Sequence, residues 1–193
     1  MNKRSADETK QNILQATRTV FAEQGYDQAS MRAIALAAGV SIGGVYLYFK
    51  SKEELYLTLM TEWMDELEDL TSRALAELTD PGEAILAFIR VAVDFAASRK
   101  DLIHLQRRDH ACSTGIDIKQ SFFRARRARI AAIIRAGIET GRFRECDAEE
   151  AAKVIFTIVR GYIMSMIVDE EALFAPEACA DLVLNGLVRR NEQ

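Results

Sequence analysis

The chain has 193 residues, of which 49% are hydrophobic, 28% are charged and only 2 are proline, and its formal net charge is −4. This length suffices for one large domain, or for a small domain joined to a medium one, with a real hydrophobic core. Scarce proline and abundant alanine, leucine, isoleucine, glutamate and arginine favour an all-helical protein.

Cysteine usage and hydropathy exclude several classes of protein. The three cysteines, Cys112, Cys146 and Cys179, are far apart and show no CxxC or metal-ligand spacing, so we expect reduced thiols, no metal site and no cofactor. The most apolar run, residues 154–168, contains Arg160 and is too short to span a bilayer, and the first ten residues are polar, unlike a signal peptide. We therefore expect a cytoplasmic protein without a membrane partner.

The charge is unevenly distributed along the chain. Residues 1–52 carry seven basic and four acidic side chains, whereas the remainder carries 18 basic and 25 acidic ones. A mildly basic N-terminal part on an acidic body suits a small nucleic-acid reader carried by another module, although chance alone also produces such a division.

The N-terminal part is expected to form three helices after a frayed polar segment, residues 1–8. The first helix starts at about Thr9 and stops at Gly25. Ser30 can cap a second helix, which Gly39 ends, and Ser41 can cap a third. A helix, a tight glycine-containing turn and a second helix form the helix-turn-helix pattern.

The rest of the chain also shows only helical patterns. Ser51 and Glu54 form a capping box that opens a long helix to about residue 78. Further helices are expected over 83–98, 101–109, 117–140, 147–168 and 176–190. The prediction is an all-α fold of about nine helices, with a helix-turn-helix domain at 1–50 and a larger helical domain at 51–193, linked by the helix from residue 52.

The third helix, within GVSIGGVYLYFKSK, has two adjacent glycines near its start. Glycine costs about 1 kcal/mol relative to alanine in a helix, so this choice needs a reason. Val45 and Phe49 share the face that would pack on the first two helices. Without side chains at Gly43 and Gly44, the N-terminal end of the helix could approach a DNA major groove closely.

From about Thr9 to Leu59 the chain resembles the N-terminal domain of the TetR family of transcriptional regulators. The matching residues are the first helix with Phe21 and Gly25-Tyr26, followed by SMRAIALAAGVSIGGVYLYFKSKEEL. The resemblance implies that the third helix enters the major groove and that the second supports it. It implies base-reading roles for Arg32, Ser41, Ile42, Gly43 and Gly44, and phosphate contacts for Tyr46, Tyr48 and Lys52.

Two details sharpen these expected roles. Many relatives have histidine where this chain has Tyr48, and a hydroxyl donor should serve as well. Because the glycines carry no base-reading side chain, we infer that Arg32, bidentate to a guanine, and apolar contact from Ile42 carry more of the specificity. Alternatively, Arg32 is a surface salt-bridge residue. Lys52 lies at a helix N-terminus, where its charge would add to the backbone N–H groups at a phosphate site.

After about residue 60 the resemblance is one of architecture only. It implies a DNA-binding domain at 1–50, a helical ligand-binding and dimerisation domain at 51–193, and a homodimer with a small-molecule effector. The helix over 147–168 is apolar nearly all round, so we expect it to be buried on two sides. Ile155, Ile158, Tyr162 and Met166 mark one of its faces. We expect dimer contacts from the other face and from the last helix, at Phe156, Ile163, Ile167, Leu182 and Gly186. Candidate effector-pocket residues, each of which could instead be ordinary core, are Trp63, Phe88, Phe95, His104, Phe122, Tyr162 and Met166.

Arg126 and Arg129 fall within the apolar stripe of the helix over 117–140, which also holds Phe122 and Ile130. A buried arginine needs a partner. It could await an anionic effector, such as the carboxylate of a fatty or aromatic acid, and for this reason Arg126 joins the candidate pocket. It could equally form a structural ion pair with an acid on a neighbouring helix, or contact the DNA-binding domain.

Two functions are compared. The first is a ligand-responsive repressor that binds a palindromic operator as a dimer and is released by a small, largely hydrophobic effector. The second is a helical protein-binding adaptor without operator function. Enzyme activity is disfavoured, because the sequence has no GxSxG, P-loop, GxGxxG or HExxH motif and no nucleophile–base pair at a convincing spacing.

Overall fold

The computed structural model describes residues 3–99, 115–166 and 175–187, and within these ranges it contains eight helices and no strand. The expected all-α class is confirmed. The short helix expected over 101–109 lies outside the described residues. The helices divide between two compact units, and the division falls within one helix, between Asp65 and Glu66.

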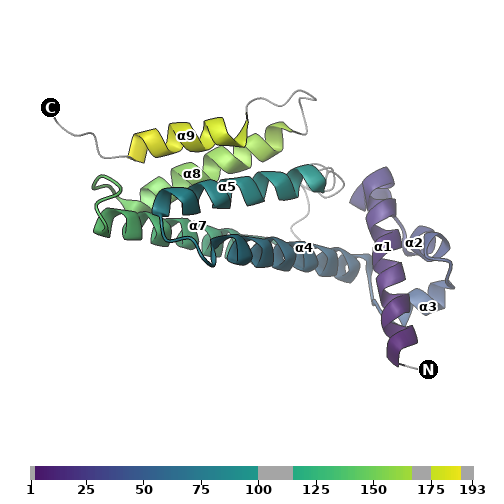
Figure 1. The fold of residues 1–193 in the computed structure, drawn as a ribbon. Coiled ribbons are helices and arrows are strands. Elements are labelled where there is room, and N and C mark those ends of the chain that lie inside the picture. The colour runs from purple at the N-terminus through teal and green to yellow at the C-terminus, as the bar shows by residue number, and fades with distance from the viewer. Residues whose placement is uncertain (1–2, 100–114, 167–174, 188–193) are drawn as a thin grey trace. The chain divides into compact units, whose positions relative to one another are not determined.

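The first unit contains the expected three N-terminal helices, α1 (Lys3–Gln28), α2 (Met31–Ala37) and α3 (Ile42–Tyr46) (Figure 1). Gly25, with φ 78°, interrupts the helical backbone of α1 as predicted. The expectation of a frayed segment before Thr9 is wrong, because α1 is already helical from Lys3. The polar residues there include no helix breaker, and each added residue extends an existing helix by one hydrogen bond.

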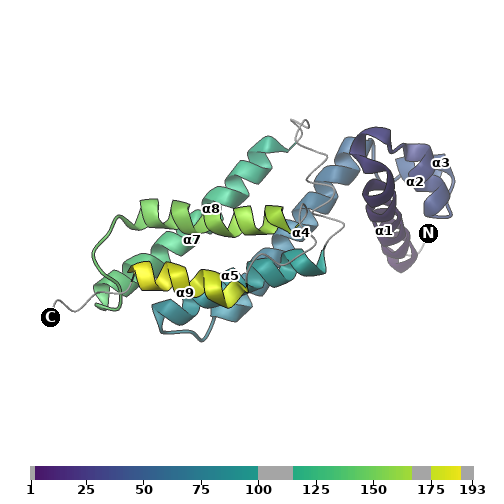
Figure 2. The ribbon, with the colours of Figure 1, turned by 90° about the horizontal axis from the view of Figure 1, so that it is seen from above.

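The fourth helix, α4, runs from Lys52 to Leu75, so it starts in the first unit and ends in the second. The second unit also contains α5 (Pro81–Ser98), α7 (Ile116–Glu139), α8 (Ala148–Ser165) and α9 (Pro176–Leu187). Within this unit α5 packs against α7, α8 and α9, and α7 packs against α8 (Figures 1 and 2).

Local capping groups set several helix starts. The Ser30 and Ser41 hydroxyls accept hydrogen bonds from the backbone N–H groups of Ala33 (3.1 Å) and Gly44 (3.0 Å), as predicted. Asp80 accepts from the N–H of Glu83 at 2.9 Å, so α5 starts at Pro81 rather than at residue 83. Proline suits the first helical position, because its missing N–H has no intrahelical partner there.

The core of the second unit lies between α5, α7 and α8. The inward face of α5 consists of these buried residues: Ile85, Phe88, Ile89, Ala92 and Phe95. On α8 the buried stripe includes Ile155 and Tyr162. Ile158, expected on that same face, is instead exposed. Periodicity alone could not orient a helix with apolar residues on nearly every side.

Among the described residues, no helix is long and apolar enough to cross a membrane. In the same part of the chain, no group of three or more His, Cys, Asp or Glu side chains could hold a metal ion. Cys146 and Cys179 are free thiols, and burial raises the pKa of Cys179.

Candidate nucleic-acid interface and effector site

The third helix packs on the other helices of the first unit through one buried face. Val45 and Phe49 are buried, and so is Ile34 on α2. The turn between α2 and α3 is closed by a hydrogen bond from the N–H of Val40 to the carbonyl of Ala35 at 3.0 Å. Gly39 adopts φ 67° in this turn, a backbone conformation that residues other than glycine rarely adopt. The helix-turn-helix geometry therefore follows from local sequence.

The opposite face of α3 carries exposed apolar and aromatic side chains. Ile42 and Tyr46 are exposed, and Tyr48 is half-buried. Two further leucines went unnoticed in the sequence: Leu36 on α2 is 84% exposed and Leu47 is 80% exposed. The run VYLYF is the sequence signal for an exposed Leu47, because one face of so short a helix cannot bury five consecutive large side chains.

The two glycines differ in their surroundings. A Cβ on Gly43 would meet nothing closer than Ser41 Oγ at 3.9 Å, so its outer side is open. A Cβ on Gly44 would lie 3.3 Å from Ser41 Oγ and 3.6 Å from Val40 Cβ. Gly44 is thus constrained by the capping serine and the turn. At Gly43 no neighbouring atom excludes a side chain, so the reason for glycine there must be a contact outside the protein.

Arg32 occupies the first turn of α2 with its side chain exposed. Within the described part of the chain it forms no ion pair. The salt-bridge interpretation of Arg32 therefore finds no support there. Its guanidinium remains available to an external acceptor.

Lys52 is placed differently from the expected phosphate contact. Its Nζ lies 2.6 Å from the carbonyl oxygen of Tyr26, 3.2 Å from that of Asp27 and 3.0 Å from that of Ala29. It also lies 4.5 Å from the centre of the Tyr26 ring. An ammonium group has three N–H donors. All three face carbonyls at the C-terminal end of α1 and at Ala29, so Lys52 joins α4 to that segment and its ammonium donors are engaged there.

The effector-pocket candidates are not all brought together. Phe88, Phe95 and Tyr162 are buried in the second unit, and Phe122 and Met166 are half-buried there. Trp63 is buried in the first unit. His104 lies outside the described residues.

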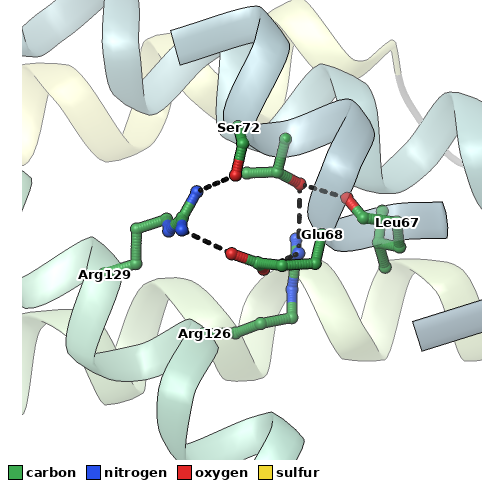
Figure 3. Close-up of polar contacts among 6 residues, drawn as sticks. Leu67, Glu68, Ser72, Arg126 and Arg129 are labelled. Carbon is green, nitrogen blue, oxygen red and sulfur yellow. Dashed lines mark hydrogen bonds and ion pairs between the residues drawn. The ribbon is translucent and has the colours of Figure 1, made fainter. Parts of the chain in front are cut away.

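Arg126 lies in a polar cluster formed by α4 and α7, which we define as Glu68, Thr71, Ser72, Arg126 and Arg129 (Figure 3). The Arg126 side chain is only 4% exposed. Its Nη1 donates to Thr71 Oγ1 at 3.1 Å and lies 3.9 Å from a Glu68 oxygen. Glu68 is bound more closely by Arg129, which also donates to Ser72 Oγ at 3.1 Å.

The surroundings of the Arg126 guanidinium are largely apolar. It stands 4.3 Å from the ring centre of Phe88 and 5.7 Å from that of Phe122. Burial lowers the pKa of Arg126 to about 10, against the opposing effect of Glu68. Arg126 is still charged at neutral pH. Its Nη2 is buried without a hydrogen-bond partner among the described residues.

The expected dimer residues occupy mixed positions. Phe156 and Ile163 are half-buried and pack against the core of the second unit, whereas Leu182 is exposed. Gly186 lies in α9, and Ile167 is outside the described residues. Two apolar residues of α8 outside the expected set are exposed: Val154, which is 58% exposed, and Ile158.

Comparison with known proteins agrees with this geometry. The family model "Bacterial regulatory proteins, tetR family" matches residues 13–59, the segment that contains the helix-turn-helix. This segment of the chain belongs to the TetR family. The family match lies in the first unit. It therefore identifies the DNA-reading head, which is the domain formed by α1, α2 and α3, and not the second unit.

Three relatives extend the comparison beyond this segment. The HTH-type transcriptional activator FasR of Mycolicibacterium smegmatis is 36% identical over 94 residues, which are 49% of this chain but only 43% of that protein. The fatty acid metabolism regulator protein of Bacillus subtilis is 25% identical over 170 residues, covering 82% of this chain and 84% of that protein. The structure of the fatty acid degradation regulator FadR from Bacillus halodurans has a TM-score of 0.81 and 25% identity, covering 94% of this chain and 97% of that one.

Proposed function

We propose that this TetR-family protein is a transcriptional repressor that binds a palindromic operator as a homodimer in the cytoplasm and is released by a small hydrophobic effector. The observation that carries the proposal is α3 itself, with Val45 buried beneath it and Ile42 and Tyr46 exposed. A buried lower face fixes the orientation of the helix, and the exposed face is left for DNA.

The contacts with DNA divide into two kinds. Arg32, Ser41, Ile42 and the two glycines would face base edges, and Tyr46 and Tyr48 would donate to phosphates. Exposure of Arg32 and the open side of Gly43 support the first assignment. Phosphate contacts set register without reading sequence, whereas a bidentate arginine discriminates guanine. Lys52 would contribute indirectly, because its contacts hold the start of α4 against the end of α1.

Dimerisation would bring two reading heads to one operator. Val154 and Ile158 form an exposed apolar stripe on α8, and Leu182 is exposed on α9. Such surfaces mark interaction sites when they are contiguous. A twofold axis would place the same surface of two protomers against each other. Replacing Ile158 by aspartate should shift the protein toward monomer in sedimentation velocity. The matched change at exposed Thr157 should leave it dimeric.

The hydrophobic effector is supported by the apolar interior of the second unit and by two relatives. Phe88, Phe95 and Tyr162 are buried there among aliphatic side chains. Two relatives that match most of the chain are named as regulators of fatty acid metabolism and fatty acid degradation. We therefore infer an effector with a hydrocarbon body, which would bias the second unit toward a state in which both heads cannot dock together.

Titration of a labelled random-sequence duplex at several salt concentrations, with the mass of the complex measured by sedimentation, tests this function. We expect salt-sensitive binding of two protomers per duplex, weakened for all sequences by Tyr46→Phe. Absence of salt-sensitive binding would contradict operator function and favour the protein-binding adaptor instead.

A further inference from the structure

The cluster at Glu68 and Arg126 holds more positive than negative charge. Two guanidinium groups, those of Arg126 and Arg129, share the single carboxylate of Glu68 (Figure 3). The other described groups in the cluster, Thr71 and Ser72, are neutral hydroxyls. The formal charge of the cluster is therefore +1.

The uncompensated charge is concentrated at Arg126. Glu68 lies 3.9 Å from Arg126 Nη1, which is too long for a hydrogen bond, and it is bound closely by Arg129 instead. The Thr71 hydroxyl donates to the carbonyl of Leu67 at 2.7 Å, so its oxygen is oriented to accept from Arg126. Arg126 Nη2 is left buried with no acceptor among the described residues.

An unsatisfied buried donor on a charged group is costly, and well-ordered proteins rarely leave one. The cluster is closed on its inner side by the Phe88 ring but open on its outer side, where the side chains of Glu68 and Arg129 are 38% and 33% exposed. An acceptor could thus reach the guanidinium if Glu68 moved aside.

We propose that this cluster is the headgroup site of the effector, and that it binds the carboxylate of an amphipathic organic acid in place of Glu68. The inference rests on the proposed function, since it specifies the chemistry of the effector. A carboxylate matches the planar donor fork of arginine. It also places a negative charge directly at Arg126 when Glu68 moves aside, which a neutral alcohol or thioester carbonyl cannot do.

The apolar surroundings indicate the remainder of the ligand. Phe88 and Phe122 flank the guanidinium, and Phe88 belongs to the buried core of the second unit together with Ile85, Ile89 and Ile130. Straight-chain and aromatic acids share the required chemistry, a carboxylate on an apolar body. In both cases the headgroup would lie at Arg126 and the body would remain in contact with apolar side chains.

Binding at this position would also change what holds α4. Glu68, Thr71 and Ser72 belong to α4, and their contacts with Arg126 and Arg129 join α4 to α7. The same helix begins at Lys52, which binds the C-terminal end of α1. A carboxylate that replaces Glu68 would remove one of the ties between α4 and α7, and this supplies the differential contact that a ligand-driven switch requires.

Calorimetry with wild type, Arg126→Met and Glu68→Gln tests the site. The probes are straight-chain carboxylates from hexanoate to palmitate, 4-phenylbutyrate, the matching alcohols and decanoyl-CoA. Methionine keeps the approximate size of the side chain and removes the charge, so the fold should persist. Arg135→Met is the control, because it removes an exposed arginine–glutamate pair from the same helix. Operator binding is measured on every sample.

We expect at least one carboxylate to bind more tightly than its alcohol, Arg126→Met to lose that affinity by about tenfold or more, and Arg135→Met to retain it. Glu68→Gln should bind the acid more tightly, because the internal competitor is gone, although a purely structural ion pair predicts no gain. Equal affinity in Arg126→Met, equal affinity for the alcohol, binding of decanoyl-CoA alone, or no binding of any carboxylate would each overturn the proposal. If operator binding persists in those cases, the DNA-binding function stands and only the headgroup site fails.

Discussion

Lys52 Nζ donates to the carbonyl oxygen of Tyr26 at 2.6 Å, which ties the first residue of α4 to the C-terminal end of α1. Two more carbonyls, those of Asp27 and Ala29, accept from the same ammonium. The reading head is therefore joined to α4 by a charged group rather than by packing alone.

Lys52→Met should lower the free energy of unfolding by about 2–3 kcal/mol, because hydrogen bonds to a charged donor are lost while the aliphatic stem is kept. Chemical denaturation measures this loss. The salt dependence of DNA binding should keep its slope. A reduction of that slope by about one would show instead that Lys52 contacts a phosphate.

Arg32→Ala should relax the preference at one base position in each half-site, with discrimination there falling by about 1–3 kcal/mol. Arg32→Lys should retain overall affinity better but lose most of the same discrimination, because lysine lacks the planar donor fork. Binding measured on a set of operators that differ at single positions separates the two effects. An unchanged preference in both variants would exclude Arg32 as a base reader.

The two glycines of α3 should respond in opposite ways to alanine. Gly43→Ala should raise the free energy of unfolding by about 0.5–1 kcal/mol, because its Cβ meets open space and alanine is the better helix former. It should nevertheless weaken operator binding. Gly44→Ala should lose that gain, since its Cβ would lie 3.3 Å from the capping hydroxyl of Ser41.

Thermal melts and operator titrations of both variants measure these effects. Undiminished operator affinity for Gly43→Ala would contradict close approach of this end of α3 to DNA.

Asp80 gives the protein an acid-sensitive helix start. Its pKa is lowered from 3.8 by the backbone N–H of Glu83 in the first place and further by Arg142, whose Nε lies 3.1 Å from Asp80 Oδ2. A lowered carboxyl pKa means that the stabilisation is complete above pH 3.8 and is lost as pH falls through the folded-state value.

Asp80→Asn, which can still cap α5, should therefore be less stable than wild type at pH 7 and approach it in stability below pH 3.8. Denaturant midpoints at several pH values measure the difference. A gap between the two proteins that stayed constant through acid would contradict this assignment.

Local chemistry made part of the fold predictable. Ser30, Ser41 and Gly39 act on neighbours in sequence, so their roles followed from spacing. Lys52 could not be placed in this way, because its acceptors lie 23 to 26 residues earlier in the chain. Pairing of Arg126 with α4 was an open alternative for the same reason, since Thr71 is 55 residues away. Ile158 was predicted on the wrong side of α8, because the sequence does not distinguish it from Ile155. Only packing against the core of the second unit shows which of the two is buried.

Selection of bound duplexes from a random DNA library at moderate salt, without effector, tests the central claim most directly. Two reading heads related by a twofold axis predict a palindrome with half-sites about 34–36 Å apart. Recovery of such a palindrome, lost when Ile158→Asp prevents dimerisation, is the result expected. Enrichment of no sequence, or of a single half-site bound by one protomer, would contradict the account.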